Sequence, residues 1–244
     1  NAFYTNMIGN EMFLDTATRR SSVVSHSKLL GYVPSSYSCS TAIVDIQILG
    51  LDLAVKSFNM PKYTKFISER IDGVNYTFVT TKEYFVENNN GTINLNGVVL
   101  KQGEPITTKY TYSVLTNPNS KFEIPNENID IETIEVLVQT SAGDLSLQPF
   151  HKFDDVLDVG PNSSVYFIQE SLTGKYEIYF GNGILGKSLV DGNIVIVNYL
   201  VTKGTDANGV SVFTMLDAPL GSYSSLVITT AQRSFRSEEH TSEL

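Results

Sequence analysis

Six Asn-Gly or Asp-Gly dipeptides recur along the chain, and they restrict its fold more than any other feature. Tight β-hairpin turns favour such pairs, because both residues can adopt a positive φ angle. Turn signals at short intervals leave little room for long helices and therefore predict a β-rich chain. The dipeptides are Asp72-Gly73, Asn90-Gly91, Asn96-Gly97, Asn182-Gly183, Asp191-Gly192 and Asn208-Gly209.

Between these dipeptides lie short runs that are rich in β-branched and aromatic residues. Several of them alternate apolar and polar positions, and this period of two places one face of a strand against a core. The aromatic residues are 13 Tyr and 13 Phe with no Trp, a composition that suits strands. We expect strands at 42–48, 76–80, 92–100, 107–115, 133–139, 165–170, 176–180 and 194–201, and an extended edge segment around Pro61.

The first 33 residues have a different pattern. Phe3, Met7 and Leu14 recur at near-helical spacing, and Gly31 followed by Pro34 ends the second of two predicted helices. The apolar face of this helical hairpin is broader than a lone hairpin can bury. The expected fold is therefore mainly β with an N-terminal helical segment, a helical hairpin followed by antiparallel β subdomains, and α+β overall.

Changes in composition suggest how the chain is divided. A less regular stretch around residues 148–161 separates two β subdomains, and the final residues are polar. The tail resembles the translation of a DNA-sequencing adapter, and the chain opens with Asn1 within a predicted helix, so we expect a truncated gene fragment that ends in an assembly artefact. The expected segments are the helical segment 1–33, the first β subdomain 34–150, the second β subdomain 151–235, and the artefact 236–244.

Residues 181–188, Gly-Asn-Gly-Ile-Leu-Gly-Lys-Ser, satisfy two phosphate-binding patterns, G-x-x-x-x-G-K-S and G-x-G-x-x-G. Both patterns need a helix directly after the loop, because the phosphate binds to the N–H groups at its start. Here a turn and the strand 194–201 follow instead. We therefore predict a β connection without nucleotide, in which the Lys187 side chain is solvated. The predicted structural turn residues are Gly181, Asn182, Gly183, Gly192, Asn208 and Gly209.

Charge and cysteine content exclude several classes of site. The formal net charge is −9 and Lys and Arg are not clustered, which argues against a nucleic-acid groove. The single cysteine, Cys39, cannot form an intrachain disulfide and has no Cys or His companions for a zinc site. No apolar run approaches the length of a membrane span.

The remaining titratable residues give no specific catalytic or metal-binding pattern. The three aspartates near residue 155 lack calcium-loop spacing, and the histidines lie far apart, although a catalytic triad is geometric and stays open. The separation of a carboxylate pair cannot be read from sequence. We expect no enzyme, no cofactor, no metal and no small-molecule substrate. The residues weighed are Asp154, Asp155, Asp158, His26, His151, His240, Glu123, Asp130, Glu170 and Glu177.

Three segments in order carry a family resemblance. They are residues 12–34, the strand-loop-strand segment 122–138, and the stretch 176–209 around Phe180-Gly181-Asn182-Gly183. Together they resemble baseplate wedge subunits of contractile-tail phages of the T-even type, in the wider baseplate J-like family. The resemblance covers residues 3 to about 213. The family usually has an acidic residue where this chain has Asn182.

The resemblance implies a structural protein without catalysis, made in the host bacterial cytoplasm and located in the virion at the tail baseplate. Implied partners are other wedge subunits and a second copy of the chain, with no nucleic acid and no membrane. Wedges of this family assemble around a central hub, and the helical segment bundles with neighbouring subunits. We expect that interface to include Phe3, Met7, Phe13, Leu14, Val23, Val24 and Leu30.

Two other functions stay open at this stage. A β-sandwich adhesin or carbohydrate-binding module would also suit Tyr-rich strands and many turns, and it would present a concave row of exposed aromatic residues. A nucleotide hydrolase would use residues 181–188, and it would bind ATP with magnesium in a manner that a Lys187→Ala change abolishes.

Overall fold

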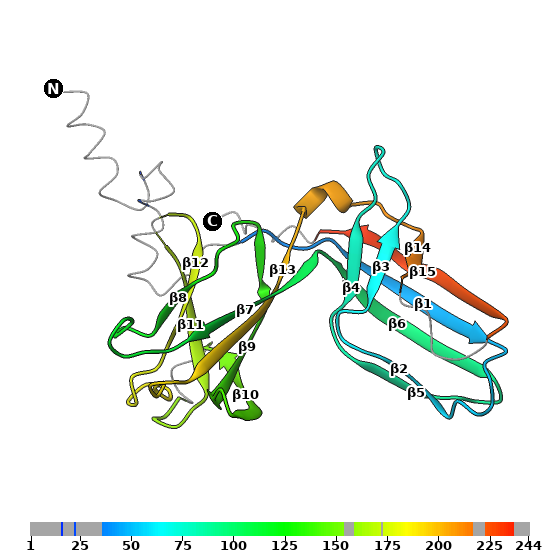
Figure 1. Cartoon of the computed structure of the whole chain (residues 1–244). Coiled ribbons are helices and arrows are strands. Elements are labelled where there is room, and N and C mark those ends of the chain that lie inside the picture. Colours follow the sequence, from blue (N-terminus) through cyan, green and yellow to red (C-terminus); the bar gives the residue numbers. More distant parts are fainter. Residues whose placement is uncertain are drawn as a thin grey trace. The chain divides into compact units, whose positions relative to one another are not determined.

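The computed structural model describes residues 36–153, 159–171, 173–216 and 223–236, together with Thr16 and Ser22. These residues form fifteen strands and one short 3-10 helix, η2 (Figure 1). In chain order the elements are β1 Thr41–Leu49, β2 Ser57–Met60, β3 Lys65–Ser68, β4 Thr77–Thr80, β5 Tyr84–Glu87, β6 Thr92–Gln102, β7 Glu104–Thr111, β8 Lys121–Glu123, β9 Ile129–Ser141, β10 Asp144–Lys152, β11 Val165–Glu170, β12 Tyr176–Phe180, β13 Ile194–Val201, η2 Gly204–Ala207, β14 Phe213–Met215 and β15 Ser225–Phe235.

The strands expected from alternation are confirmed, but the α+β fold class is wrong. Nearly all regular structure in the described chain is β, and η2 is a single turn. The helical share of that prediction rested on residues 1–33, which lie outside the described residues except for Thr16 and Ser22. The fold class of the described residues depends on strands that pair between distant segments. The helical spacing of apolar residues within 1–33 gives no information about that pairing.

The chain divides into two compact units, each of which is described by itself. Among the described residues, the first unit contains Thr107–Glu127 and Thr133–Tyr199, and the second contains Tyr37–Ile106, Asn128–Glu132 and those between 200 and 236. The chain passes from one unit to the other within β7, β9 and β13, so neither unit is one continuous stretch of sequence. The boundary expected near residue 150 falls inside the first unit, close to the end of β10.

The second unit contains a six-stranded antiparallel sheet in the order β14-β3-β4-β6-β1-β15, and β2 pairs with β5 in a separate two-stranded sheet. The large sheet curls, so that its edge strands β14 and β15 come into contact (Figure 1). Backbone hydrogen bonds between Ser234 and the segment Gly209–Val210, at 2.7 and 2.9 Å, help to close this side. The result is barrel-like.

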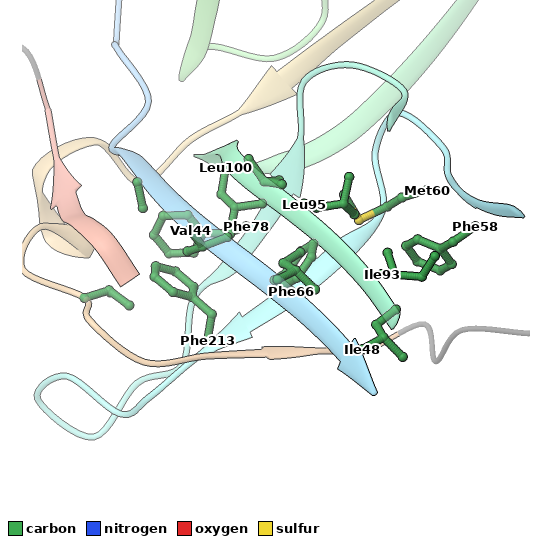
Figure 2. Packing of buried hydrophobic residues seen from close by; sticks show 14 of the residues in the cluster. Val44, Ile48, Phe58, Met60, Phe66, Phe78, Ile93, Leu95, Leu100 and Phe213 are labelled. Carbon is green, nitrogen blue, oxygen red and sulfur yellow. The ribbon is translucent and has the colours of Figure 1, made fainter. Parts of the chain in front are cut away.

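Alternate residues of these strands fill the core of the second unit. On β1 the buried positions are Ala42, Val44, Ile46 and Ile48, as a period of two requires. Figure 2 shows how side chains from β1, β2, β3, β4, β6 and β14 meet around Phe66 and Phe78. The ring of Phe78 packs edge-on against Phe213, with ring centroids 5.0 Å apart. Each fully buried side chain of this size contributes about 1.5–3 kcal/mol to folding.

Asn96-Gly97 forms a bulge and not the predicted hairpin turn. β6 runs unbroken through this dipeptide, and its pairing with β1 shifts between Val44 and Ile46. Gly97 has φ +68°, and its N–H donates to the Asp45 carboxylate at 2.8 Å. A bulge also uses a residue with positive φ, so the dipeptide alone cannot separate a bulge from a turn.

Two other dipeptides form the tight turns expected of them. Asp72 and Gly73 have φ of +50° and +84° inside the bridge between Ile71 and Val74. Asn90-Gly91 repeats this geometry, with φ of +50° and +82°. Positive φ at both central residues is the property that selects such pairs for hairpins.

The first unit contains a seven-stranded sheet in the order β7-β13-β9-β10-β11-β12-β8. Its edge strands also meet, because the Tyr110 hydroxyl on β7 donates to the Glu123 carbonyl on β8 at 2.6 Å. Inside, Phe180 packs edge-on against Phe122 and Phe150, with ring centroids 5.9 and 5.4 Å apart. This second curled sheet therefore closes around an aromatic core.

The expectation of purely antiparallel subdomains is wrong at one position. β10 and β11 are parallel, with His151 opposite Val165 and Lys152 opposite Tyr166. Parallel neighbours need a longer connection than a hairpin turn. The sequence between these two strands, residues 153–164, overlaps the stretch around residues 148–161 that was interpreted from sequence as a boundary. No helix in the described ranges has both the length and the apolar character needed to span a membrane.

Candidate functional site

The loop between β12 and β13, residues 181–193, contains the phosphate-binding patterns found in the sequence. Its backbone folds back on itself, since a Cβ atom added to Gly181 would lie 2.3 Å from the carbonyl carbon of Gly186 and 2.4 Å from its oxygen. Gly183 and Gly186 have φ of +83° and +79°. The glycines therefore permit a close backbone crossing and left-handed turns.

Five successive amides of this loop already have acceptors within the chain. Gly183 donates to the Gly186 carbonyl at 3.0 Å, and the N–H groups of Ile184 and Leu185 donate to Oδ1 of Asn182 at 3.0 and 3.1 Å. The next two N–H groups donate to carbonyl groups in the segment before β11. Gly186 donates to the Gly160 carbonyl at 3.2 Å, and Lys187 donates to the Ser163 carbonyl at 2.8 Å. A phosphate cradle needs such N–H groups free and pointing at the ligand.

The rest of the loop is equally committed to the fold. The Lys187 ammonium donates to Oε1 of Gln148 at 2.9 Å, and β13 follows where both nucleotide patterns need a helix. Oδ1 of Asn193 accepts from the Val190 N–H at 2.8 Å and so closes a turn around Gly192, which has φ +87°. The side-chain amide of Asn193 donates to the Thr140 carbonyl at 2.9 Å. Sequence reasoning missed Asn193, although its place directly after Asp-Gly was a usable signal.

Asn208-Gly209 connects segments that lie far apart in sequence. Oδ1 of Asn208 accepts from the Ser40 hydroxyl at 2.7 Å and from the Arg236 N–H at 2.9 Å. Gly209 has φ +89° and donates to the Ser234 carbonyl at 2.7 Å. The dipeptide therefore joins the start of β1 to the end of β15. The predicted interface residues between Phe3 and Leu30 lie outside the described residues, and that interface stays a prediction.

A buried polar cluster of the second unit surrounds Asp130, which is only 3% exposed. Its Oδ2 accepts from the Cys39 N–H at 3.0 Å and from the Lys101 ammonium at 3.3 Å, and Oδ1 accepts from the Glu132 N–H at 3.0 Å. The same residues line a pocket of about 400 Å³ together with Thr41, Gln232 and Phe235. Sequence reasoning included Asp130 among the strand carboxylates but gave no sign of its burial.

This cluster is built for structure and not for nucleophilic chemistry. Burial, and next the neighbouring charge of Asp130, raise the pKa of the Cys39 thiol well above its ordinary value. A reactive cysteine needs the opposite shift, because the thiolate is the nucleophile. In the same unit, Oε1 of Gln102 accepts from the Thr202 hydroxyl at 2.7 Å and from the Lys203 N–H at 2.8 Å. The polar groups here hold distant segments together.

Other candidate residues do not gather into a site. Glu123 and Glu177 are register partners on β8 and β12, and each carboxylate pairs with a lysine, Lys175 at 3.5 Å and Lys121 at 3.7 Å. Such crossed ion pairs are common on sheet faces. His151 is exposed on β10. Among described residues, no group of three or more His, Cys, Asp or Glu could hold a metal ion. The other candidates weighed from sequence lie outside the described residues: Asp154, Asp155, Asp158, His26 and His240.

Comparison with known proteins confirms the resemblance found in the sequence. Residues 106–205 match the family described as "Bacteriophage baseplate wedge protein gp6, third domain". A curated relative, "Baseplate wedge protein gp6" of Enterobacteria phage T4, is 27% identical over 239 residues, which cover 89% of this chain and 34% of that protein. The chain thus spans about a third of the length of that relative.

A solved structure also matches, the cryo-EM structure of the anti-feeding prophage baseplate. The match covers 96% of this chain and 42% of that chain, with 10% sequence identity and a TM-score of 0.25. A score of that size supports no conclusion about the fold.

Proposed function

We propose that this chain, whose residues 106–205 match the third-domain family of baseplate wedge protein gp6, is part of a structural subunit of a phage tail baseplate wedge. One observation carries the proposal: the matched range nearly coincides with the first compact unit, Thr107–Glu127 and Thr133–Tyr199. The family pattern therefore corresponds to a folded body with its own aromatic core. The glycine-rich loop of the sequence resemblance lies within it.

The geometry supports a scaffold more than a catalyst. The loop amides, the Asp130 carboxylate and the Gln102 carbonyl all have partners inside the chain, so these polar groups fix backbone positions. The T4 relative is named as a baseplate wedge protein, a name that assigns no reaction. A structural subunit of an assembly acts through the shape of its folded units and not through a chemical reaction. It therefore needs units whose backbone positions are fixed.

The finer assignments extend this proposal. The chain would act at the tail baseplate of the virion, joined to other wedge subunits and to a second copy of itself, without nucleic acid, membrane or small-molecule partners. The apolar residues expected at an interface, between Phe3 and Leu30, would contact those neighbouring subunits. The formal charge of −9 supports a protein partner over nucleic acid.

The comparisons do not support the alternative of an adhesin or carbohydrate-binding module. The exposed large aromatic residues of the described chain, Tyr37, Phe85 and Phe235, all belong to the second unit. In the first unit Phe167 lies between Phe153 and Tyr179, with centroid distances of 4.7 and 5.0 Å, so their faces are engaged with one another. Sugar-binding aromatic residues need a free ring face.

Co-expression tests the proposal. The full-length gene should be expressed with its neighbouring tail genes, purified through a tag on this chain, and sized by light scattering after gel filtration. A complex of defined mass that contains other tail proteins is the expected result, and omitting one neighbouring gene at a time identifies the direct partners. If the full-length protein stays alone with every neighbour present, or binds glycans on an array instead, the proposal is wrong.

A further inference from the structure

Four Asn-Gly dipeptides place a side-chain amide next to a backbone nitrogen that can attack it. In this reaction the Gly nitrogen bonds to the Asn side-chain carbon Cγ, and the side-chain nitrogen leaves as ammonia, which takes up the Gly proton. Water then opens the cyclic succinimide to aspartate or isoaspartate. Glycine favours the attack because it has no side chain to hinder its nitrogen. The pairs are Asn90-Gly91, Asn96-Gly97, Asn182-Gly183 and Asn208-Gly209.

The fold engages the attacking nitrogen of every pair in a hydrogen bond. Gly91 donates to Oδ1 of Asn88 at 2.8 Å, Gly97 to Oδ1 of Asp45 at 2.8 Å, Gly183 to the Gly186 carbonyl at 3.0 Å, and Gly209 to the Ser234 carbonyl at 2.7 Å. Such a bond must open before the nitrogen can turn toward Cγ, so each one slows ring closure.

Three of the pairs are also held by further bonds. Oδ1 of Asn182 accepts from two backbone N–H groups, and Oδ1 of Asn208 accepts from a hydroxyl and an N–H group, so both Asn side chains are fixed. Beside Asn90 it is the acceptor of the Gly N–H that is fixed. The Asn88 side-chain amide donates to two backbone carbonyls at 3.1 and 2.7 Å.

The pair Asn96-Gly97 has less support than the other three. Both residues are exposed, and within the described ranges the Asn96 side chain has no hydrogen-bond partner. The acceptor of the Gly97 N–H is the half-buried Asp45 carboxylate, which makes no other hydrogen bond with the described residues. The bulge sets these two residues of β6 against Asp45 alone, so the regular ladder is interrupted there. One bond to a side chain therefore restrains this nitrogen.

We infer that Asn96 is the residue at which this chain first deamidates. The aspartate product places a second carboxylate near Asp45 on the adjacent strand, and like charges in such positions repel. The isoaspartate product adds a methylene group to the backbone of β6 and so disturbs the alternation that buries Val98 and Leu100. Both products weaken the pairing of β6 with β1. The inference concerns the chemistry of this chain alone and does not depend on the proposed function.

Peptide mapping of the aged full-length protein tests the inference. The protein is incubated in mildly alkaline buffer and digested in mildly acidic buffer, where ring closure is slow, and mass spectrometry measures aspartate and isoaspartate at each pair. We expect Asn96 to convert before the other three residues. Asp45→Ala removes the acceptor and should speed conversion at Asn96 roughly fivefold. Asp45→Asn is the matched control, since its side-chain oxygen can still accept the bond, and it should convert as wild type.

The other three pairs serve as an internal control in the same maps. Earlier conversion at any of them overturns the inference, as does an unchanged rate at Asn96 in Asp45→Ala. Equal acceleration at all four pairs would show general loosening and would also overturn it. Thermal unfolding before and after ageing gives a second measurement with Asn96→Ser, which cannot form the succinimide at this position.

The midpoint of wild type should fall on ageing and that of Asn96→Ser should not. Equal falls would show that chemistry elsewhere in the chain causes the loss, against the inference. Each of these results leaves the proposed function to the co-expression experiment, so the two can fail separately.

Discussion

The carboxylate of Asp130 accepts a hydrogen bond from the backbone N–H of Cys39 at 3.0 Å, although 91 positions separate the two residues. The same oxygen faces the Lys101 ammonium at 3.3 Å, and the Asp130 side chain is 4% exposed. One carboxylate therefore connects three distant segments of the second unit: the approach to β1, the end of β6 and the start of β9.

Replacing Asp130 with Ala should destabilise the protein by roughly 2–4 kcal/mol, because two N–H groups lose their acceptor and Lys101 loses its counter-charge. Urea unfolding of the purified protein measures this. Glu104→Ala, which breaks the exposed pair with Lys65 at 3.3 Å, is the matched control and should change stability by less than about 0.5 kcal/mol. Equal losses for the two variants would contradict the role given to Asp130.

Cys39 should give the unfolding free energy a dependence on alkaline pH. Below the ordinary thiol pKa of 9.0, folded and unfolded chains both keep the proton. Above it the unfolded chain releases the proton and the folded chain retains it, because burial raises the folded pKa, so stability falls as pH rises, by at most about 1.4 kcal/mol per pH unit.

The measurement is urea unfolding between pH 8 and 11 for wild type and Cys39→Ala. The variant should show the shallower decline. Burial also raises the pKa of Tyr110 to about 12, which adds a decline of the same sign to both proteins and cancels in the difference. Parallel curves for the two proteins would show that Cys39 titrates alike in both states.

The glycines of the loop 181–193 should differ in their tolerance of alanine. Gly181→Ala places a Cβ atom 2.3 Å from backbone of Gly186, so the loop must move, and we expect a loss of about 3 kcal/mol. Gly183→Ala meets only Ser188 Oγ at 3.7 Å, and its φ of +83° should cost about 1 kcal/mol. Thermal unfolding ranks them, and the reverse order would refute the backbone crossing.

Asn182 should tolerate replacement by Asp better than replacement by Ala. Its Oδ1 accepts from two N–H groups at 3.0 and 3.1 Å, and a carboxylate oxygen can accept the same bonds. Because the loop is exposed, Asn182→Ala should cost only about 0.5–1 kcal/mol. Chemical denaturation of the three proteins checks this, with Asp close to wild type.

ATP with magnesium should not bind saturably at residues 181–188, since five successive amides there already have acceptors within the chain. Isothermal titration of wild type and Lys187→Ala should give the same flat trace. Saturable heat that Lys187→Ala abolishes would reopen the reading as a nucleotide hydrolase.

Local signals in the sequence predicted local structure well. Alternation located β11, β12 and β13 to the residue, and the dipeptides at residues 72–73 and 90–91 form the turns expected of them. These features depend on neighbouring residues, whose preferences the sequence displays directly. The turn and the β-branched run after residue 188, where a nucleotide loop would have a helix, likewise predicted that the loop leads into a strand.

Features that depend on distant segments could not be predicted in this way. The parallel pairing of β10 with β11, the bulge at Asn96-Gly97 and the burial of Asp130 each depend on a partner strand that the local pattern does not name. The two interleaved units follow from the same cause.

The position of β1 between β6 and β15 has a consequence for synthesis in the cell. Thr41 on β1 pairs with Phe235 on β15. During synthesis β1 therefore emerges long before β15, and one of its edges stays unpaired until β15 has been made. Until then β1 presents a free row of backbone groups to any other extended chain. At ordinary translation rates of roughly 5–20 residues per second this exposure lasts on the order of ten seconds. Ribosome-bound intermediates of this protein should therefore depend on chaperones that bind extended segments.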